Sequence, residues 1–179
     1  MRLPLHHYGD PILKQPTSPV GRFTPEITSL IKDMLETMEK SNGVGLAAPQ
    51  VGRSERICVI HVPRDAEDEA FAEANAAVEM PLVMVNPDIL SKEGNLRRQE
   101  GCLSFPGFYV DITRAKTVTF AYTDATGERK TATASGLLAR AVQHEVDHLD
   151  GTTLPDRMSP AQRLLNARKL KALLETPGR

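Results

Sequence analysis

The sequence predicts an α+β fold: a single domain in which mainly antiparallel strands pack around a central helix that carries a His-Glu-x-x-His motif, followed by a C-terminal helix. Three observations predict this class. The 179 residues fit one domain with its own core. Predicted strands and helices do not alternate strictly as β-α-β. A glycine-containing segment, 124–127, separates two β-rich runs, which is typical of an antiparallel hairpin.

The bulk composition narrows the cellular setting and the partners. Lys and Arg number 22 and Asp and Glu 23, so the net charge of −1 attracts neither DNA nor a membrane surface. The two cysteines are too few for a secreted disulfide framework and indicate a reducing compartment. No run approaches the roughly 18 apolar residues of a membrane span. We therefore expect a cytoplasmic protein, with a mature organellar form as the alternative.

The first predicted helix spans about Thr24 to Asn42. Thr24 can cap it, Pro25 suits its first turn, and Asn42-Gly43 supplies the stop. Apolar residues recur at the spacing of one helical face, which indicates packing on a core: Ile27, Leu30, Ile31, Met34, Leu35 and Met38.

Short β-branched runs predict strands at 57–60 and 82–85, and we expect the second to stop at Asn86-Pro87 because proline cannot donate to a ladder. The acidic, alanine-rich segment 64–79 between them lacks a clear apolar face and predicts a surface loop or a loose helical excursion. Residues 117–122 and 129–133 form the predicted hairpin.

Two further helices are predicted towards the C-terminus. The first covers about 136–150 and has an apolar face, and the second covers 159–175 and begins with Ser159-Pro160, a capping residue followed by proline. Its cations make this last helix locally basic, and a solvated face is the ordinary interpretation of such charges: Arg163, Arg168, Lys169 and Lys171.

The strongest chemical signal is His144-Glu145-Val146-Asp147-His148 within the predicted helix 136–150. Side chains four residues apart lie on one helical face, so two imidazoles can bind one ion, and Glu145 is placed to accept a proton from metal-bound water. By itself the pattern could also be a chance arrangement of solvated side chains.

A catalytic metal site of this kind needs a third protein ligand. An extended zinc-protease motif would place histidine at the position of Leu154, and a downstream glutamate could only be Glu175, close to the C-terminus. Cys102, in the glycine- and proline-bounded segment 100–107, is the better candidate because a thiolate binds zinc or iron strongly. Cys58 lies in an apolar run and is interpreted as core.

Three segments resemble the signature motifs of the peptide deformylase family, in the family's order: Gly43-Val44-Gly45-Leu46-Ala47-Ala48-Pro49-Gln50, Glu100-Gly101-Cys102-Leu103-Ser104, and His144-Glu145-Val146-Asp147-His148. Together with 9–13, the resemblance extends from near the start to about residue 160. It is most similar to the branch that includes bacterial and plastid forms.

The resemblance implies roles for individual residues. The metal would be bound by Cys102, His144 and His148, and Glu145 would act as general acid and base. The Gln50 amide and the Leu103 backbone N–H would stabilise the oxyanion. The substrate pocket would be lined by residues that could equally be turn or core positions: Val44, Gly45, Leu137 and Ala141.

The function that the resemblance implies is metal-dependent removal of the formyl group from the N-terminal formylmethionine of nascent polypeptides. Because such substrates emerge from the ribosome, the basic helix 159–175 is then a candidate contact for ribosomal RNA. The ion expected in the cell is Fe²⁺, whereas a Cys and two His also accept Zn²⁺, Ni²⁺ or Co²⁺. Two alternatives stay open from the sequence. One is a metallopeptidase that cleaves internal peptide bonds, and the other is a structural metal domain with a fourth protein ligand.

Overall fold

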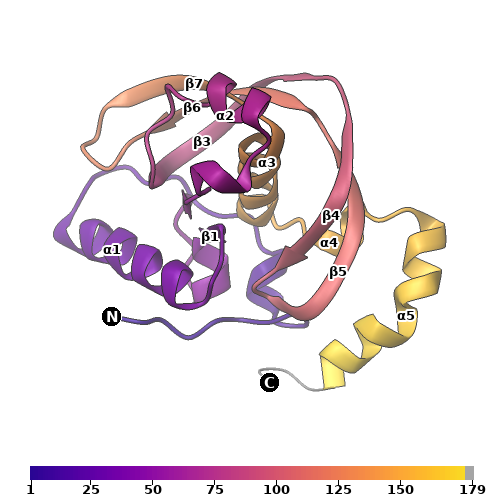
Figure 1. Ribbon diagram of the computed structural model, residues 1–179. Helices are drawn as coiled ribbons and strands as arrows, with labels where there is room; N and C mark the ends of the chain where they lie inside the picture. The colour runs from indigo at the N-terminus through magenta and orange to yellow at the C-terminus, as the bar shows by residue number, and fades with distance from the viewer. Residues whose placement is uncertain (176–179) are drawn as a thin grey trace.

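The computed structural model describes residues 1–175 and places helix α3 (Gly136–Leu149) at the centre of two antiparallel sheets (Figure 1). The main sheet has the strand order β1-β2-β3-β6-β7. Its strands are β1 (Gly45–Ala47), β2 (Ile57–Ile60), β3 (Leu82–Glu93), β6 (Thr117–Thr123) and β7 (Arg129–Ser135). Strands β4 (Leu96–Cys102) and β5 (Phe105–Arg114) form the second sheet. Every strand pair is antiparallel, which confirms the predicted α+β class.

The remaining helices lie around these sheets. They are α1 (Pro25–Lys40), α2 (Glu69–Ala74), α4 (Leu154–Arg157) and α5 (Pro160–Glu175), with 3-10 turns η1 (Pro11–Lys14), η2 (Ala48–Val51) and η3 (Arg64–Ala66). Helix α1 begins as predicted, because the Thr24 hydroxyl accepts the Ile27 N–H at 3.4 Å and Pro25 occupies the first turn.

Strand β2 is buried on both faces because it lies between two helices. Alternate side chains of a strand point to opposite faces. Cys58 and Ile60 pack in the cluster that α3 covers, whereas Ile57 and Val59 pack in the cluster that α1 covers. This double burial explains the uninterrupted apolar run 57–60, and it confirms Cys58 as a core residue.

Strand β3 is longer than predicted: the expected stop at Asn86-Pro87 is wrong, and the strand continues to Glu93. The register shifts between Val85 and Asp88, so Pro87 sits at an irregularity where no ladder donor is needed. Asn86 adopts a φ of +51°, and its side chain bonds the N–H and the carbonyl of Val20, both at 2.8 Å. These two bonds stabilise the bulge.

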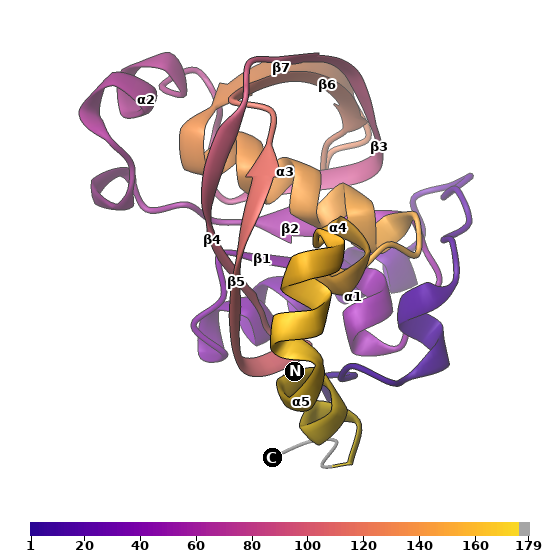
Figure 2. The same cartoon turned by 90° about the vertical axis from the view of Figure 1, so that its right-hand side faces the viewer.

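The acidic segment between β2 and β3 contains η3 and α2, which lie beside the N-terminal end of α3 and project from the body (Figures 1 and 2). The sequence predicts a surface loop or a loose helical excursion for 64–79, and α2 shows that the central part of this segment is helical. The segment connects adjacent strands of the main sheet.

Helix α5 packs on the β4–β5 side of the molecule through Leu170 and Leu173. Helix α5 lies at one side of the molecule (Figure 1), and Leu164 and Leu165 in its first half remain 79% and 82% exposed. Within residues 1–175, the structure has no helix with the length and apolar character that a membrane crossing requires.

Candidate active site

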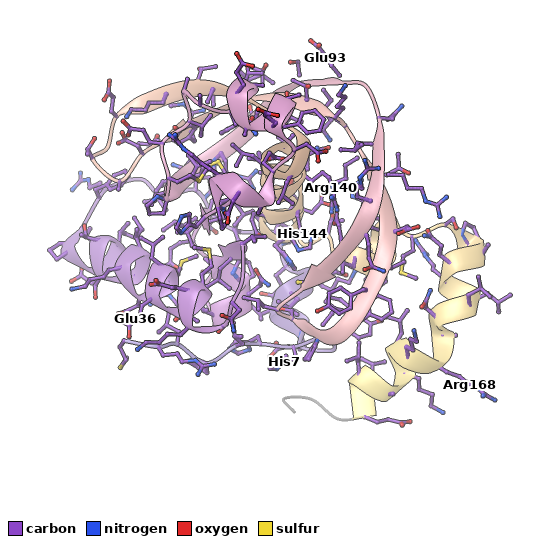
Figure 3. All side chains as sticks on the ribbon, viewed as in Figure 1. His7, Glu36, Glu93, Arg140, His144 and Arg168 are labelled. Carbon is purple, nitrogen blue, oxygen red and sulfur yellow. The ribbon has the colours of Figure 1, made fainter. Side chains whose placement is uncertain are left out.

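Two segments far apart in the sequence converge on one point between α3 and β4. His144 and His148 project from the same side of α3, and Cys102 is the last residue of β4. The His144 and His148 Nε2 atoms are 3.2 Å apart, and the Cys102 sulfur is 3.2 Å from His148 Nε2. Figure 3 shows His144 beside Arg140 near the centre of the molecule. The three predicted ligands are therefore brought together.

The spacing of these atoms fits a metal ion. Nitrogens bound tetrahedrally at about 2.0–2.1 Å stand about 3.3 Å from each other. All three ligand atoms lie within 4.8 Å of one another. Two imidazoles and one thiolate form a three-ligand set, which leaves a fourth tetrahedral position for solvent or substrate.

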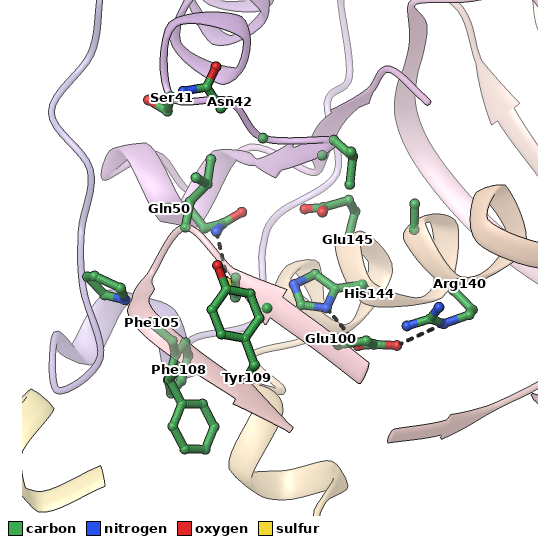
Figure 4. Close-up of a pocket in the computed structure, with 18 of the residues that line it drawn as sticks. Ser41, Asn42, Gln50, Glu100, Phe105, Phe108, Tyr109, Arg140, His144 and Glu145 are labelled. Atoms are coloured by element: carbon green, nitrogen blue, oxygen red, sulfur yellow. Dashed lines mark hydrogen bonds and ion pairs between the residues drawn. The ribbon is translucent and has the colours of Figure 1, made fainter. Parts of the chain in front are cut away.

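Glu100 orients the first histidine. Its Oε2 lies 3.2 Å from His144 Nδ1. Burial by itself would raise the pKa of Glu100, but the hydrogen bonds with His144 and Arg114 lower that pKa to about 2. The ionised carboxylate can only accept, so Nδ1 carries the hydrogen and Nε2 is available as a ligand. Figure 4 shows His144 and Arg140 meeting Glu100 from the same helix.

Arg114 holds the Glu100 carboxylate in the position that orients His144. Its guanidinium donates to both Glu100 oxygens, at 2.7 and 3.0 Å, and to Asp147 at 2.8 Å. Arg157 donates to the same Asp147 carboxylate at 2.9 Å. The contacts of Arg114 and Arg157 with Asp147 tie β5, α3 and α4 together at the base of the site.

Glu145 lies on the opposite side of the ligands, close to β1. Its side chain is buried, and burial raises its pKa to about 7, against the opposing effect of His144 and Arg114. Its Oε2 has no hydrogen-bond partner among the described residues. The carboxylate contacts the backbone of Gly45, and a Cβ there would stand 2.8 Å from its Cδ. A buried carboxyl with a free oxygen is suited to proton transfer near neutral pH.

Gln50 is held so that its amide nitrogen faces the ligands. The Ala47 N–H donates to Gln50 Oε1 at 2.8 Å, which fixes the orientation of the amide. Gln50 Nε2 then lies 3.4 Å from the Cys102 sulfur and 3.2 Å from the Ser104 hydroxyl. Leu103 occupies the turn between β4 and β5. The two predicted oxyanion donors thus flank the same ligand.

A pocket of about 500 Å³ opens beside these groups. Its walls include all four predicted substrate residues together with most of the other site residues: Val44, Gly45, Gln50, Cys102, Leu103, Leu137, Ala141, His144 and Glu145. His148 does not line the pocket and is buried behind the other ligands. The volume of the pocket is within the range of small-molecule sites.

Arg140 and Tyr109 are among the pocket residues that could not be assigned to the site from the motifs. Arg140 precedes His144 by one helical turn, so its position on the pocket face of α3 could have been inferred from the spacing. It donates to the Gln99 carbonyl at 2.8 Å and lies 3.6 Å from Glu100. Tyr109 is on β5, a strand that was not predicted, although the alternation of apolar residues at 108, 110 and 112 could have indicated it.

Comparisons with known proteins agree with this geometry. The family model of polypeptide deformylases matches residues 2–164. The chain is 41% identical over 170 residues to the peptide deformylase of Endomicrobium trichonymphae, covering 95% of this chain and 94% of that one. It is 43% identical over 169 residues to the peptide deformylase of Wolinella succinogenes, covering 94% and 95%.

Solved structures give the same result. The crystal structure of peptide deformylase from Ehrlichia chaffeensis has a TM-score of 0.86 at 35% identity, with 96% of each chain covered. That from Synechococcus elongatus in complex with actinonin has a TM-score of 0.82 at 41% identity, covering 95% of this chain and 88% of that one. The match of both sequence and fold over nearly the whole length shows that this chain belongs to the polypeptide deformylase family.

Proposed function

We propose that this protein removes the formyl group from the N-terminal formylmethionine of nascent polypeptides in a metal-dependent hydrolysis. The observation that carries the proposal is the convergence of Cys102, His144 and His148 beside Glu145 at one wall of the pocket. When bound there, a divalent ion supplies Lewis acidity, which lowers the pKa of a water molecule and polarises a carbonyl oxygen.

Glu145 is proposed as the general base and acid. Its buried carboxylate has a free oxygen on the pocket side of α3, and that oxygen can accept a proton from the attacking water. The same carboxyl can then deliver this proton to the amine as the C–N bond breaks. The products are formate and a peptide with a free N-terminus.

Gln50 and Leu103 are proposed to stabilise the negative charge that develops on the formyl oxygen. The Gln50 amide is already oriented by the Ala47 N–H, so no reorganisation is needed when the charge appears. The proposed donor of Leu103 is its backbone N–H, at the start of the turn that follows the ligand Cys102.

The methionine side chain is proposed to enter the pocket between β1 and α3. Val44, just before β1, and Gly45, the first residue of β1, line it on one side, and Leu137 and Ala141 of α3 line it on the other. A mostly apolar slot suits an unbranched thioether. Gly45 also approaches Glu145 closely, so this apolar part of the pocket lies beside the residue proposed as the general base.

The ion that we propose for the cell is Fe²⁺, and the site also accepts Zn²⁺, Ni²⁺ or Co²⁺. A Cys and two His are a suitable donor set for any of these ions. The cytoplasm is the proposed compartment, in keeping with the bacterial-type relatives.

We further propose a contact between α5 and ribosomal RNA. Support comes from the exposed side chains of the helix, which include Leu164, Leu165 and the cations Arg163, Arg168 and Lys169. The charge-reversal variant Arg168→Glu/Lys169→Glu is expected to lose salt-dependent co-sedimentation with ribosomes and to keep its turnover of free peptide. Unchanged co-sedimentation would identify these cations as a solvated face.

One assay tests the main proposal. Protein loaded anaerobically with Fe²⁺ is incubated with a formylmethionyl peptide and with its unformylated twin, and both formate release and peptide cleavage are measured. Formate release from the first peptide alone is expected. Cleavage of internal bonds in both peptides would instead indicate a metallopeptidase.

A further inference from the structure

We propose that Glu67 is a positioning residue: from the segment between β2 and β3 it caps the N-terminus of α3 and thereby sets the pocket wall formed by Leu137 and Ala141. This inference rests on the proposed role of that wall in binding the substrate side chain. Glu67 is 70 residues away from the helix it caps, and nothing in the motifs of the active site points to it.

The Glu67 carboxylate bonds two of the free N–H groups at the start of α3. The Leu137 N–H donates to Oε1 at 2.6 Å and the Leu138 N–H donates to Oε2 at 3.1 Å. The helix supplies no cap of its own, since the Ser135 side chain makes no capping bond and the first turn holds no acidic residue. A carboxylate at this position satisfies the unpaired donors and the positive end of the helix dipole.

A second contact holds the segment in place. Asn75, at the end of α2, donates to the Ser135 carbonyl at 3.0 Å and accepts the Ser135 N–H at 2.8 Å. The same Asn75 amide donates to Glu67 at 3.2 Å. Glu67 is therefore hydrogen-bonded to Asn75, which in turn bonds both the N–H and the carbonyl of Ser135, the residue before α3.

The ring of Phe71 completes this contact. Gly136, with a φ of +62°, has no room for a side chain, because Phe71 and Glu67 occupy the space where its Cβ would lie. Lys116 stands 5.5 Å from the centre of the Phe71 ring. The acidic segment thus covers the first residue of α3 closely, in spite of its exposed and polar composition.

The cap should affect the pocket wall more than the metal ligands, because the wall residues lie nearer to the start of α3. Leu137 is in the capped turn and Ala141 is one turn later, whereas His144 is held separately by Glu100. Loss of the cap should therefore loosen the pocket wall and leave the metal ligands in place. The expected signature is a change in KM and in side-chain selectivity at nearly constant kcat and metal content.

The test compares Glu67→Ala and Glu67→Gln with Glu73→Ala, an exposed carboxylate of α2 that serves as the matched control. We expect Glu67→Ala to raise KM for a formylmethionyl peptide about tenfold, since a small misplacement of a positioning group is costly. The preference of this variant for the formylmethionyl peptide over a formylleucyl peptide should fall. Its kcat and metal content should stay within about twofold of the wild type. In Glu67→Gln the amide oxygen can still accept a hydrogen bond from the helix N-terminus, so its KM should lie between those of the wild type and Glu67→Ala.

Amide hydrogen exchange provides a readout that does not depend on activity. The Leu137 and Leu138 amides should be protected in the wild type and in Glu73→Ala, and should exchange faster in Glu67→Ala. Equal protection in all variants, or a KM for Glu67→Ala equal to that of the control, would overturn the inference. A wild-type protein that releases no formate would refute the proposed function instead, and the exchange result would still stand.

Discussion

The backbone of Gly45 in β1 lies directly against the carboxylate of Glu145 in α3, with space for a hydrogen atom and none for a methyl group. This contact joins the edge of the main sheet to the motif helix at the point where the proposed chemistry takes place. Glycine is needed here for close approach, because a Cβ would stand 2.8 Å from the Glu145 Cδ.

Gly45→Ala is therefore expected to displace the Glu145 carboxylate and to lower kcat/KM by about 100-fold. Metal content should stay unchanged, because the added Cβ would meet Glu145 and not a metal ligand. Gly21→Ala is the control, since nothing stands within 4 Å of an added Cβ there. Activity equal to that of the control would show that Glu145 tolerates displacement.

Glu145→Gln keeps the shape of the side chain and removes its basicity. Turnover should fall by about 10²- to 10⁴-fold, the usual contribution of a general base. The metal should remain bound, because the Cys102, His144 and His148 ligands are untouched. Steady-state kinetics and metal analysis of the same preparation check this, and substantial retained formate release would contradict the assigned role.

Gln50→Ala removes one proposed oxyanion donor. Loss of such a donor lowers kcat by about 10²- to 10³-fold, and the loss should appear in kcat more than in KM because the charge develops only in the transition state. Ser104→Ala, which removes the hydroxyl that Gln50 bonds at 3.2 Å, should have a smaller effect. A KM effect alone for Gln50→Ala would assign this residue to ground-state binding.

Glu100→Gln should weaken metal binding by about 10- to 100-fold, the usual effect of losing a group that orients a ligand. It should also destabilise the fold, by up to about 3–5 kcal/mol, because Arg114 keeps a buried charge with a weaker partner. The control is Asp111→Asn, in the exposed Arg97–Asp111 pair of the same hairpin, with an expected cost of about 0–1 kcal/mol. Chelator competition and thermal unfolding measure both effects.

Metal exchange should separate iron from the other ions. The Fe²⁺ form is expected to lose activity in air as the Cys102 thiolate is oxidised, whereas a Ni²⁺ form should keep its activity. Removal of the ion by a chelator should abolish formate release, and Ni²⁺ should restore it. Equal stability of both forms in air would argue against the oxidation of an iron-bound thiolate.

Much of the fold could be predicted from local chemistry. The limits of α1 follow from Thr24 and Pro25, and the β6–β7 hairpin follows from the turn that contains Gly127 at a φ of +89°. These features depend on side chains that bond or constrain the adjacent backbone. Strand β4 could not be predicted because it is polar and mostly exposed, with little apolar patterning. Strand β5 was overlooked, although its apolar residues at 108, 110 and 112 alternate as in a half-buried strand.

The sequence by itself determined that two imidazoles and a carboxylate share one turn of a helix, since the spacing of His144, Glu145 and His148 is a local property of the chain. Only the tertiary structure decided where the sulfur of Cys102 lies, how Glu100 orients His144, and that Glu67 caps α3. Each of these contacts joins residues at least 44 positions apart. They form only when the sheets pack on the helix, because burial is what makes an unpaired charge or donor costly enough to select a single partner.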